Sequence, residues 1–249
     1  MVSTQVATGG CARKFPKAQA AAVTALAWAR DGAQLVSAAS DGAVRTHGLK
    51  SGRQLQHFRG HAAAVAAVAF GAGDAVLSAA ADATVRVWDA RSAETTATFE
   101  AANALAKHER RADAAKAGAA VVALLAVPGE AHRYVVVDRS PTALLADPRS
   151  GAVHATYSTT AEPAKAATAA GRTPGCAFAA GALSRPTGAW FLGLGEDRVL
   201  YCFETKTGKL DRCLAVGDGT HDVTGVACHP HRALAATFGE GDQLALWRA

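Results

Sequence analysis

The sequence contains no run of eighteen or more apolar residues, although 50% of its 249 residues are apolar. A helix that crosses a bilayer needs about 20 such residues, so we expect no membrane-spanning helix. The N-terminus also lacks the apolar stretch of a secretory signal. No acidic residue precedes Asp31, and the basic residues before it are also typical of a transit peptide. We give that alternative less weight because part of the segment fits the repeat pattern described below.

Cysteine is scarce, and none of its spacings forms a CxxC pair. The five cysteines are Cys11, Cys176, Cys202, Cys213 and Cys228. An odd number without a secretory signal indicates reduced thiols in the cytosol or nucleus. His229 and His231 are too few to hold a metal ion, and no cluster of cysteines or acids accompanies them, so a turn is the favoured interpretation. The sequence therefore predicts no metal site and no cofactor.

One segment places three short strand-like stretches between Gly60-His61 and Trp88-Asp89. These stretches lie at residues 65–70, 75–78 and 82–87, with the alternation of apolar residues that strands show. A Gly-His opening and a Trp-Asp close are typical of one WD40 propeller blade. Such blades stack around an axis and present loops to partners. The first hypothesis is therefore a binding scaffold and not an enzyme.

The pattern recurs along the chain. The position of Trp88 is matched by His47, Ala146, Phe203 and Trp247, at spacings of 41, 58, 57 and 44 residues. The first and last spacings agree with the roughly 40–45 residues of one blade. The two longer spacings predict mobile surface insertions at residues 100–118 and 158–175, which are polar or rich in alanine.

The sequence therefore predicts an all-β fold in a single domain, residues 1–249, which is a WD40 β-propeller with five recognisable blades. The predicted repeats are residues 17–59, 60–99, 119–157, 175–216 and 220–249. The last repeat stops after its third strand, whereas residues 10–15 resemble a lone outer strand. A propeller loses its exposed edges when its first strand completes its last blade. We therefore expect residues 10–15 to be the closing strand.

Four polar or aromatic residues of the second repeat have a structural and a catalytic interpretation. His61, Ser78, Asp82 and Trp88 occupy the positions that form a hydrogen-bonded chain in WD40 blades. The alternative is a Ser-His-Asp catalytic set. We favour the structural tetrad because the repeat accounts for every member, and buried polar groups must satisfy one another. No catalytic residue is therefore expected.

Four basic residues cluster around the first repeat: Arg45, Lys50, Arg53 and Arg59. A solvated surface is favoured over a nucleic-acid site, and no interleaving of basic and aromatic residues supports RNA stacking. The net charge of +5 permits weak attraction to nucleic acid or acidic proteins and leaves direct RNA contact open. The cluster is the candidate interaction patch of this chain.

Two passages are more specific than the WD40 pattern. Residues 45–53 read Arg-Thr-His-Gly-Leu-Lys-Ser-Gly-Arg, and residues 195–203 read Gly-Glu-Asp-Arg-Val-Leu-Tyr-Cys-Phe. With Cys-His-Pro-His at residues 228–231, they closely resemble the spliceosomal WD40 proteins of the SMU type (suppressor of mec and unc). The order and spacing of these passages hold over nearly the whole chain.

The resemblance implies a nuclear, non-catalytic scaffold of pre-mRNA splicing with spliceosomal proteins as partners. Members of that family carry LisH and CTLH helices before a seven-bladed propeller, and the chain resembles only the propeller part. Because the family dimerises and contacts the RED protein through the helical region, we expect both interactions to be weakened or lost here. A WD40 adaptor in another nuclear or cytoplasmic complex, such as one in ubiquitin ligation, is the alternative.

Overall fold

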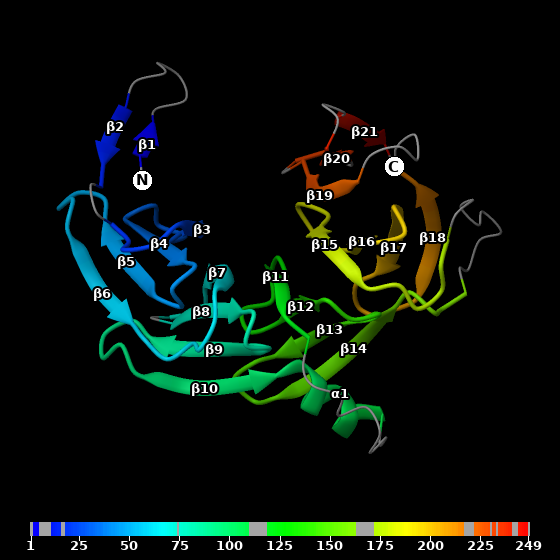
Figure 1. Cartoon of the computed structure of the whole chain (residues 1–249), viewed down its shortest axis with the longest axis horizontal. Helices are drawn as coiled ribbons and strands as arrows, with labels where there is room; N and C mark the ends of the chain where they lie inside the picture. The colour runs from blue at the N-terminus through cyan, green and yellow to red at the C-terminus, as the bar shows by residue number, and fades with distance from the viewer. Residues whose placement is uncertain are drawn as a thin grey trace.

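The computed structural model of the chain consists almost entirely of antiparallel β-sheets (Figure 1). It describes residues 2–4, 11–15, 18–73, 75–109, 119–162, 172–216, 222–229, 231–232, 234–240 and 244–248. Over these residues, four sheets of four strands and one of three follow one another around an arc, and a two-stranded sheet lies at its N-terminal end. The predicted all-β, partial propeller with five blades is confirmed. The blades are numbered one to five in chain order.

Within each blade, the strands pair with one another in chain order. Blade one comprises β3 (Val23–Trp28), β4 (Gln34–Ala39), β5 (Val44–Gly48) and β6 (Gln54–Phe58). Blade two comprises β7 (Val65–Phe70), β8 (Ala75–Ala80), β9 (Thr84–Asp89) and β10 (Thr95–Glu100). Blade three comprises β11 (Val121–Ala126), β12 (Tyr134–Asp138), β13 (Thr142–Asp147) and β14 (Ala152–Ser158). Blade four comprises β15 (Phe178–Leu183), β16 (Trp190–Gly195), β17 (Val199–Glu204) and β18 (Leu210–Ala215). Blade five comprises β19 (Val223–Cys228), β20 (Leu234–Gly239) and β21 (Leu244–Arg248). The exact limits of the repeats stay predictions.

The core lies between consecutive blades, because each sheet buries its faces against its neighbours. The first strands of neighbouring blades contact one another, and the second strands β8 and β12 are buried along their whole length. Aromatic rings fill the contact between blades three and four, where Tyr157 and Phe191 lie 4.8 Å apart and Phe191 and Phe203 lie 5.9 Å apart. Each such ring pair contributes about 0.5–1.5 kcal/mol beyond the area that it buries.

The N-terminal strand pairs differently from the prediction. Strand β2 (Cys11–Lys14) pairs with β1 (Val2–Thr4) and not with β21. Strands β2 and β21 lie at opposite ends of the arc in Figure 1. The prediction that residues 10–15 close the last blade is therefore wrong in this structure. Pairing two strands that are close in sequence costs less conformational entropy than closure across the whole chain. Phe15 also holds the segment on blade one, since it is buried with its ring 5.4 Å from that of His47.

The first predicted insertion contains a packed helix. Helix α1 (Ala101–Glu109) follows β10 directly, and Ala101 and Ala104 are buried in the core cluster between blades two and three. Alanine is the strongest helix former, and residues three apart share one helix face. The prediction of a mobile surface segment is therefore wrong for residues 101–109, while residues 110–118 lie outside the described residues. In the described part of the chain, no helix is long and apolar enough to cross a membrane.

The second predicted insertion is partly described. Thr159 is buried, and its hydroxyl donates to the Cys176 carbonyl at 2.9 Å. The Arg172 guanidinium donates to the Thr159 carbonyl at 3.1 Å. These contacts hold the two ends of the insertion against each other. Residues 163–171 lie outside the described residues, so the predicted mobility there stays a prediction.

The two ends of the arc expose apolar side chains. On β3, Leu26 is 50% exposed and Trp28 is 56% exposed. On blade five, Leu244 pairs with Phe238 across the sheet, and both are at least 49% exposed. Residues that pair directly across strands share one face of the sheet. Blade five therefore presents an apolar face that no described residue covers.

Candidate functional site

The structure joins the four residues of the predicted tetrad into one hydrogen-bonded chain. The Trp88 indole donates from Nε1 to the Ser78 hydroxyl at 2.8 Å. Ser78 Oγ lies 2.7 Å from His61 Nε2, and His61 Nδ1 lies 2.9 Å from Asp82 Oδ2. In one consistent arrangement the hydroxyl donates to Nε2, and the Nδ1–H group donates to the carboxylate. The network ties β8 and β9 to the loop before β7.

The electrostatics of this network fit a structural role. Burial lowers the pKa of His61 from its ordinary value, so the imidazole is neutral at pH 7. Burial alone would raise the pKa of Asp82, but hydrogen bonds from Thr84, His61 and the Ala62 amide hold it at about 2. Ser78 is fully buried and already hydrogen-bonded to Trp88 and His61. Its hydroxyl therefore has no free path to a substrate.

Blades one, four and five build variants of the same network. In blade one, His47 replaces the tryptophan and contacts Ser37 Oγ at 2.8 Å, while the Gln19 amide donates to the same oxygen at 2.7 Å. In blade five, Trp247 Nε1 donates to the Thr237 hydroxyl at 2.9 Å. Sequence reasoning missed Gln19, because it lies in an irregular segment 18 residues before its partner.

In blade four, a tyrosine replaces the histidine as the donor to the aspartate. The Tyr201 hydroxyl donates to Asp197 Oδ2 at 2.6 Å, and the Thr173 amide donates to the same oxygen at 2.8 Å. The pKa of Tyr201 is raised, first by burial and then by this hydrogen bond, so the phenol stays protonated and continues to donate. The signal in the sequence was a tyrosine four residues after the aspartate, within the strand pattern.

The four residues of the predicted basic patch do not form one surface. Arg45 is half-buried, and its Nη1 donates to Gln19 Oε1 at 2.6 Å and to the Ala18 carbonyl at 3.0 Å. Lys50 and Arg53 lie in the turn between β5 and β6, whereas Arg59 follows the far end of β6. The five residues of β6 separate these ends by about 16 Å. The prediction of a single patch is therefore corrected to an exposed pair, Lys50 and Arg53.

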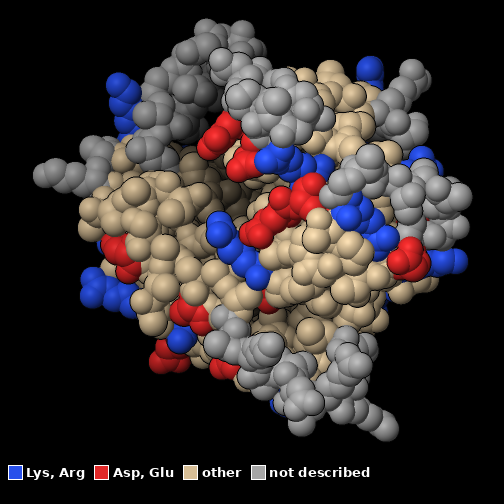
Figure 2. All heavy atoms as spheres, turned by 45° about the vertical axis from the view of Figure 1, so that its right-hand side comes forward, with Lys and Arg blue, Asp and Glu red and all other residues tan. Residues whose placement is uncertain are grey.

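Charges of both signs share the surface elsewhere. On the face shown in Figure 2, Lys and Arg side chains are interspersed with Asp and Glu. A large field of one sign is the usual electrostatic footprint of a nucleic-acid-binding surface. The face in Figure 2 does not carry such a field, so contacts with proteins are the better match for it.

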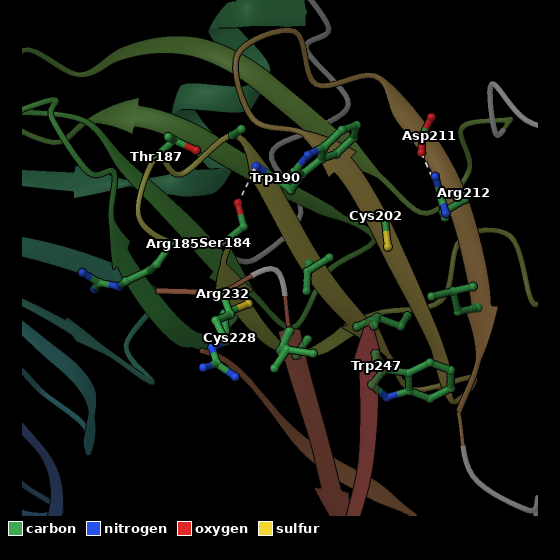
Figure 3. Close-up of a pocket in the computed structure, with 16 residues that line it drawn as sticks. Ser184, Arg185, Thr187, Trp190, Cys202, Asp211, Arg212, Cys228, Arg232 and Trp247 are labelled. Atoms are coloured by element: carbon green, nitrogen blue, oxygen red, sulfur yellow. Dashed lines mark hydrogen bonds and ion pairs between the residues drawn. The ribbon is translucent and has the colours of Figure 1, made fainter. Parts of the chain in front are cut away.

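A cavity of about 340 Å³ opens between blades four and five (Figure 3). Its walls are mainly apolar. Blade four contributes Trp190, Leu192, Leu200, Cys202 and Leu214, and blade five contributes Cys228, Leu234, Ala235 and Trp247. Burial raises the pKa of Cys202 to about 12 and also raises the pKa of Cys228. Both thiols are therefore neutral at pH 7 and serve as apolar wall.

The register of the strands in blade five shows why a cavity forms at this place. Ala235 pairs with Trp247 on the face toward blade four. The corresponding position holds Leu35, Val76, Tyr134 and Phe191 in blades one to four, and all four side chains are buried. Alanine thus stands where every other blade places a larger side chain.

The described residues contain no group of three or more His, Cys, Asp and Glu that could hold a metal ion. His229 Nδ1 accepts hydrogen bonds from the amides of His231 and Arg232, each at 3.0 Å. The histidine thus stabilises the turn after β19, in agreement with the turn interpretation of this segment.

A protein-family comparison supports the class that this architecture indicates. The family described as "WD domain, G-beta repeat" matches residues 9–46 and 52–89. These residues therefore carry WD40 repeats, and the described sheets form a partial WD40 β-propeller. Domains of this class are typically non-catalytic and mediate protein–protein interactions.

Proposed function

We propose that this protein is a non-catalytic interaction scaffold of pre-mRNA splicing, located in the nucleus with spliceosomal proteins as its partners. The scaffold part rests on the WD40 repeats and on blades whose strand interiors are committed to packing. The splicing part rests on the resemblance of residues 45–53 and 195–203 to the SMU-type proteins.

The observation that carries the proposal is the structure of the first of these passages. Residues 45–53 form β5 and the turn into β6. Gly52 has a positive φ of +69°, and a Cβ at Gly48 would lie only 2.6 Å from Ser51 Oγ, so the turn itself explains both glycines. The turn does not require basic side chains, yet Lys50 and Arg53 are exposed on it. They are the basic residues of the passage that lie exposed at the surface.

The proposal also concerns which family interactions this propeller retains. In the SMU-type proteins, dimerisation and the RED contact belong to the helical region, which the described blades do not contain. We therefore propose that the blades bind spliceosomal proteins through their loops, with RED binding and dimerisation weak or absent. No enzymatic turnover forms part of the proposal.

The test is recovery of partners from nuclear extract with the tagged full chain. We expect co-purification of splicing proteins, which falls with rising salt and with the double variant Lys50→Glu, Arg53→Glu, because rim charges act through screened attraction. The matched control reverses two other exposed charges, Arg30→Glu and Lys206→Glu. Exclusion from the nucleus together with no recovery of splicing proteins would refute the splicing role. Recovery of ubiquitin-ligase subunits instead would establish the adaptor alternative.

A further inference from the structure

We infer that the cavity between blades four and five is a receptor for one bulky apolar side chain of an acidic peptide segment. This inference is independent of the proposed role in splicing, because it concerns the cavity and not the identity of the complex. It rests on the shape of the cavity, on the missing side-chain volume at Ala235 and on the charges at its rim.

The cavity has the size and lining of a side-chain receptor. Its volume of about 340 Å³ is near the lower end of ligand pockets, which run from roughly 300 to 1,000 Å³. Trp190 and Trp247 both line it, and Trp190 is 41% exposed. An incoming ring would therefore meet indoles at an accessible opening, where aromatic pairs are favourable.

The neighbouring blade contact shows what would fill the space. Between blades three and four, Phe191 occupies the position of Ala235 and packs against Tyr157 and Phe203. Between blades four and five, that position holds only the methyl group of Ala235. A phenylalanine, leucine or tryptophan of a partner would occupy the volume that the chain's own side chain occupies one blade earlier. Burying such a side chain away from water favours binding.

The basic residues at the rim of the cavity favour a negatively charged partner. Arg185 and Arg232 are exposed, and Figure 3 shows both on the same side of the cavity. Within the described ranges, neither guanidinium has an acidic partner. Arg212 is different, because its Nε lies 2.9 Å from Asp211, the one acid among the lining residues. Two available guanidinium groups beside an apolar floor match carboxylates that flank an apolar anchor.

A binding experiment with purified full-length protein tests the inference. The probe is a labelled ten-residue peptide of Asp and Glu with one central Phe, and fluorescence anisotropy measures its affinity. We expect saturable binding that falls at least tenfold when the Phe is replaced by Ala or when the flanking acids are replaced by Lys. The protein variant Arg185→Glu, Arg232→Glu should also bind at least tenfold more weakly, with little change in melting temperature because both side chains are exposed.

Filling the cavity supplies the decisive comparison. Ala235→Leu should reduce binding at least tenfold while leaving the melting temperature unchanged or higher. The control is Ala236→Leu, on the same strand but on the opposite face, which should bind as the unaltered protein does. Should Ala235→Leu prove unfolded, the arginine variant decides. Undiminished binding in the folded Ala235→Leu protein, or equal affinity for the Phe and Ala peptides, would overturn the inference. So would absence of peptide binding, or preferential binding of a dT10 oligonucleotide that the arginine variant loses.

Discussion

At the scale of single residues, each group of the His61 network supplies the one partner that the next group needs. Replacing His61 or Asp82 by alanine leaves buried polar atoms without a partner, which costs about 1–3 kcal/mol. We expect each variant to lower the free energy of unfolding by that amount in urea titrations. His132→Ala is the control, because His132 is exposed. Unchanged stability in both network variants would show that the network is not structural.

The same network predicts how stability depends on pH. Burial lowers the pKa of His61, and burial followed by the charge of Arg45 lowers that of His47. The unfolded chain therefore binds protons near pH 6.5 more readily than the folded chain, so stability is present above pH 6.5 and is lost as the pH falls below it. Asp82, with its pKa near 2, adds a second loss between pH 3.8 and about 2.

Urea titrations at pH 7.5 and 5.5 measure the histidine contribution. We expect a smaller free energy of unfolding at pH 5.5, and a smaller difference between the two pH values in His61→Gln. The His132→Gln protein is the comparison, since that histidine is exposed and should leave the pH dependence as it was. Equal stability of the unaltered protein at both pH values would contradict the assignment of neutral, buried imidazoles.

Sequence reasoning identified the tetrad because the blade repeat relates residues that are 27 positions apart. It did not identify the cavity, because the informative residue is an alanine in a chain with many alanines. Only the register of β20 and β21 shows that Ala235 stands where other blades have Leu, Val, Tyr or Phe. The basic patch failed for a related reason. A long arginine side chain can turn back to the chain, and Arg45 does so at Gln19.

At the scale of elements, helix α1 is fixed by its small buried face. Introducing a lysine at Ala104 places a charge in the cluster between blades two and three. We expect Ala104→Lys to destabilise the protein by more than 1 kcal/mol and to speed cleavage by trypsin near Lys107. Asn103→Lys adds the same charge on the exposed face and should have little effect on either measurement. Equal rates of cleavage in the two variants would mean that α1 is not packed.

Strands were the most predictable elements, since apolar alternation recurs along the chain and Asp-Gly or Ser-Gly turns separate strands in blades one and three. The helix was not predicted, because its alanines were interpreted as part of a polar loop and its packing depends on distant strands. The closing strand was predicted from the repeat pattern alone. That pattern does not show that a nearer strand can pair with residues 11–14. In the structure, β1 pairs with β2.

At the scale of the whole molecule, the unclosed arc makes the blades a linear series of neighbours. Blades two, three and four each pack between two sheets, whereas blade five packs against blade four alone within the described residues. In such arrays, the stability of a unit is the sum of its own folding and its contacts with neighbours. Blade five should therefore open without unfolding the remainder.

Hydrogen exchange measures these differences in stability between the blades directly. We expect the amides of β19–β21 to exchange through local opening, and those of β8 and β12 only through global unfolding. A single exchange free energy for all blades would contradict it. Local stability therefore differs along the arc. The middle blades stay folded, whereas blade five can unfold and refold on its own. A partner bound in the cavity would contact both blade four and blade five. Binding should therefore slow hydrogen exchange throughout blade five.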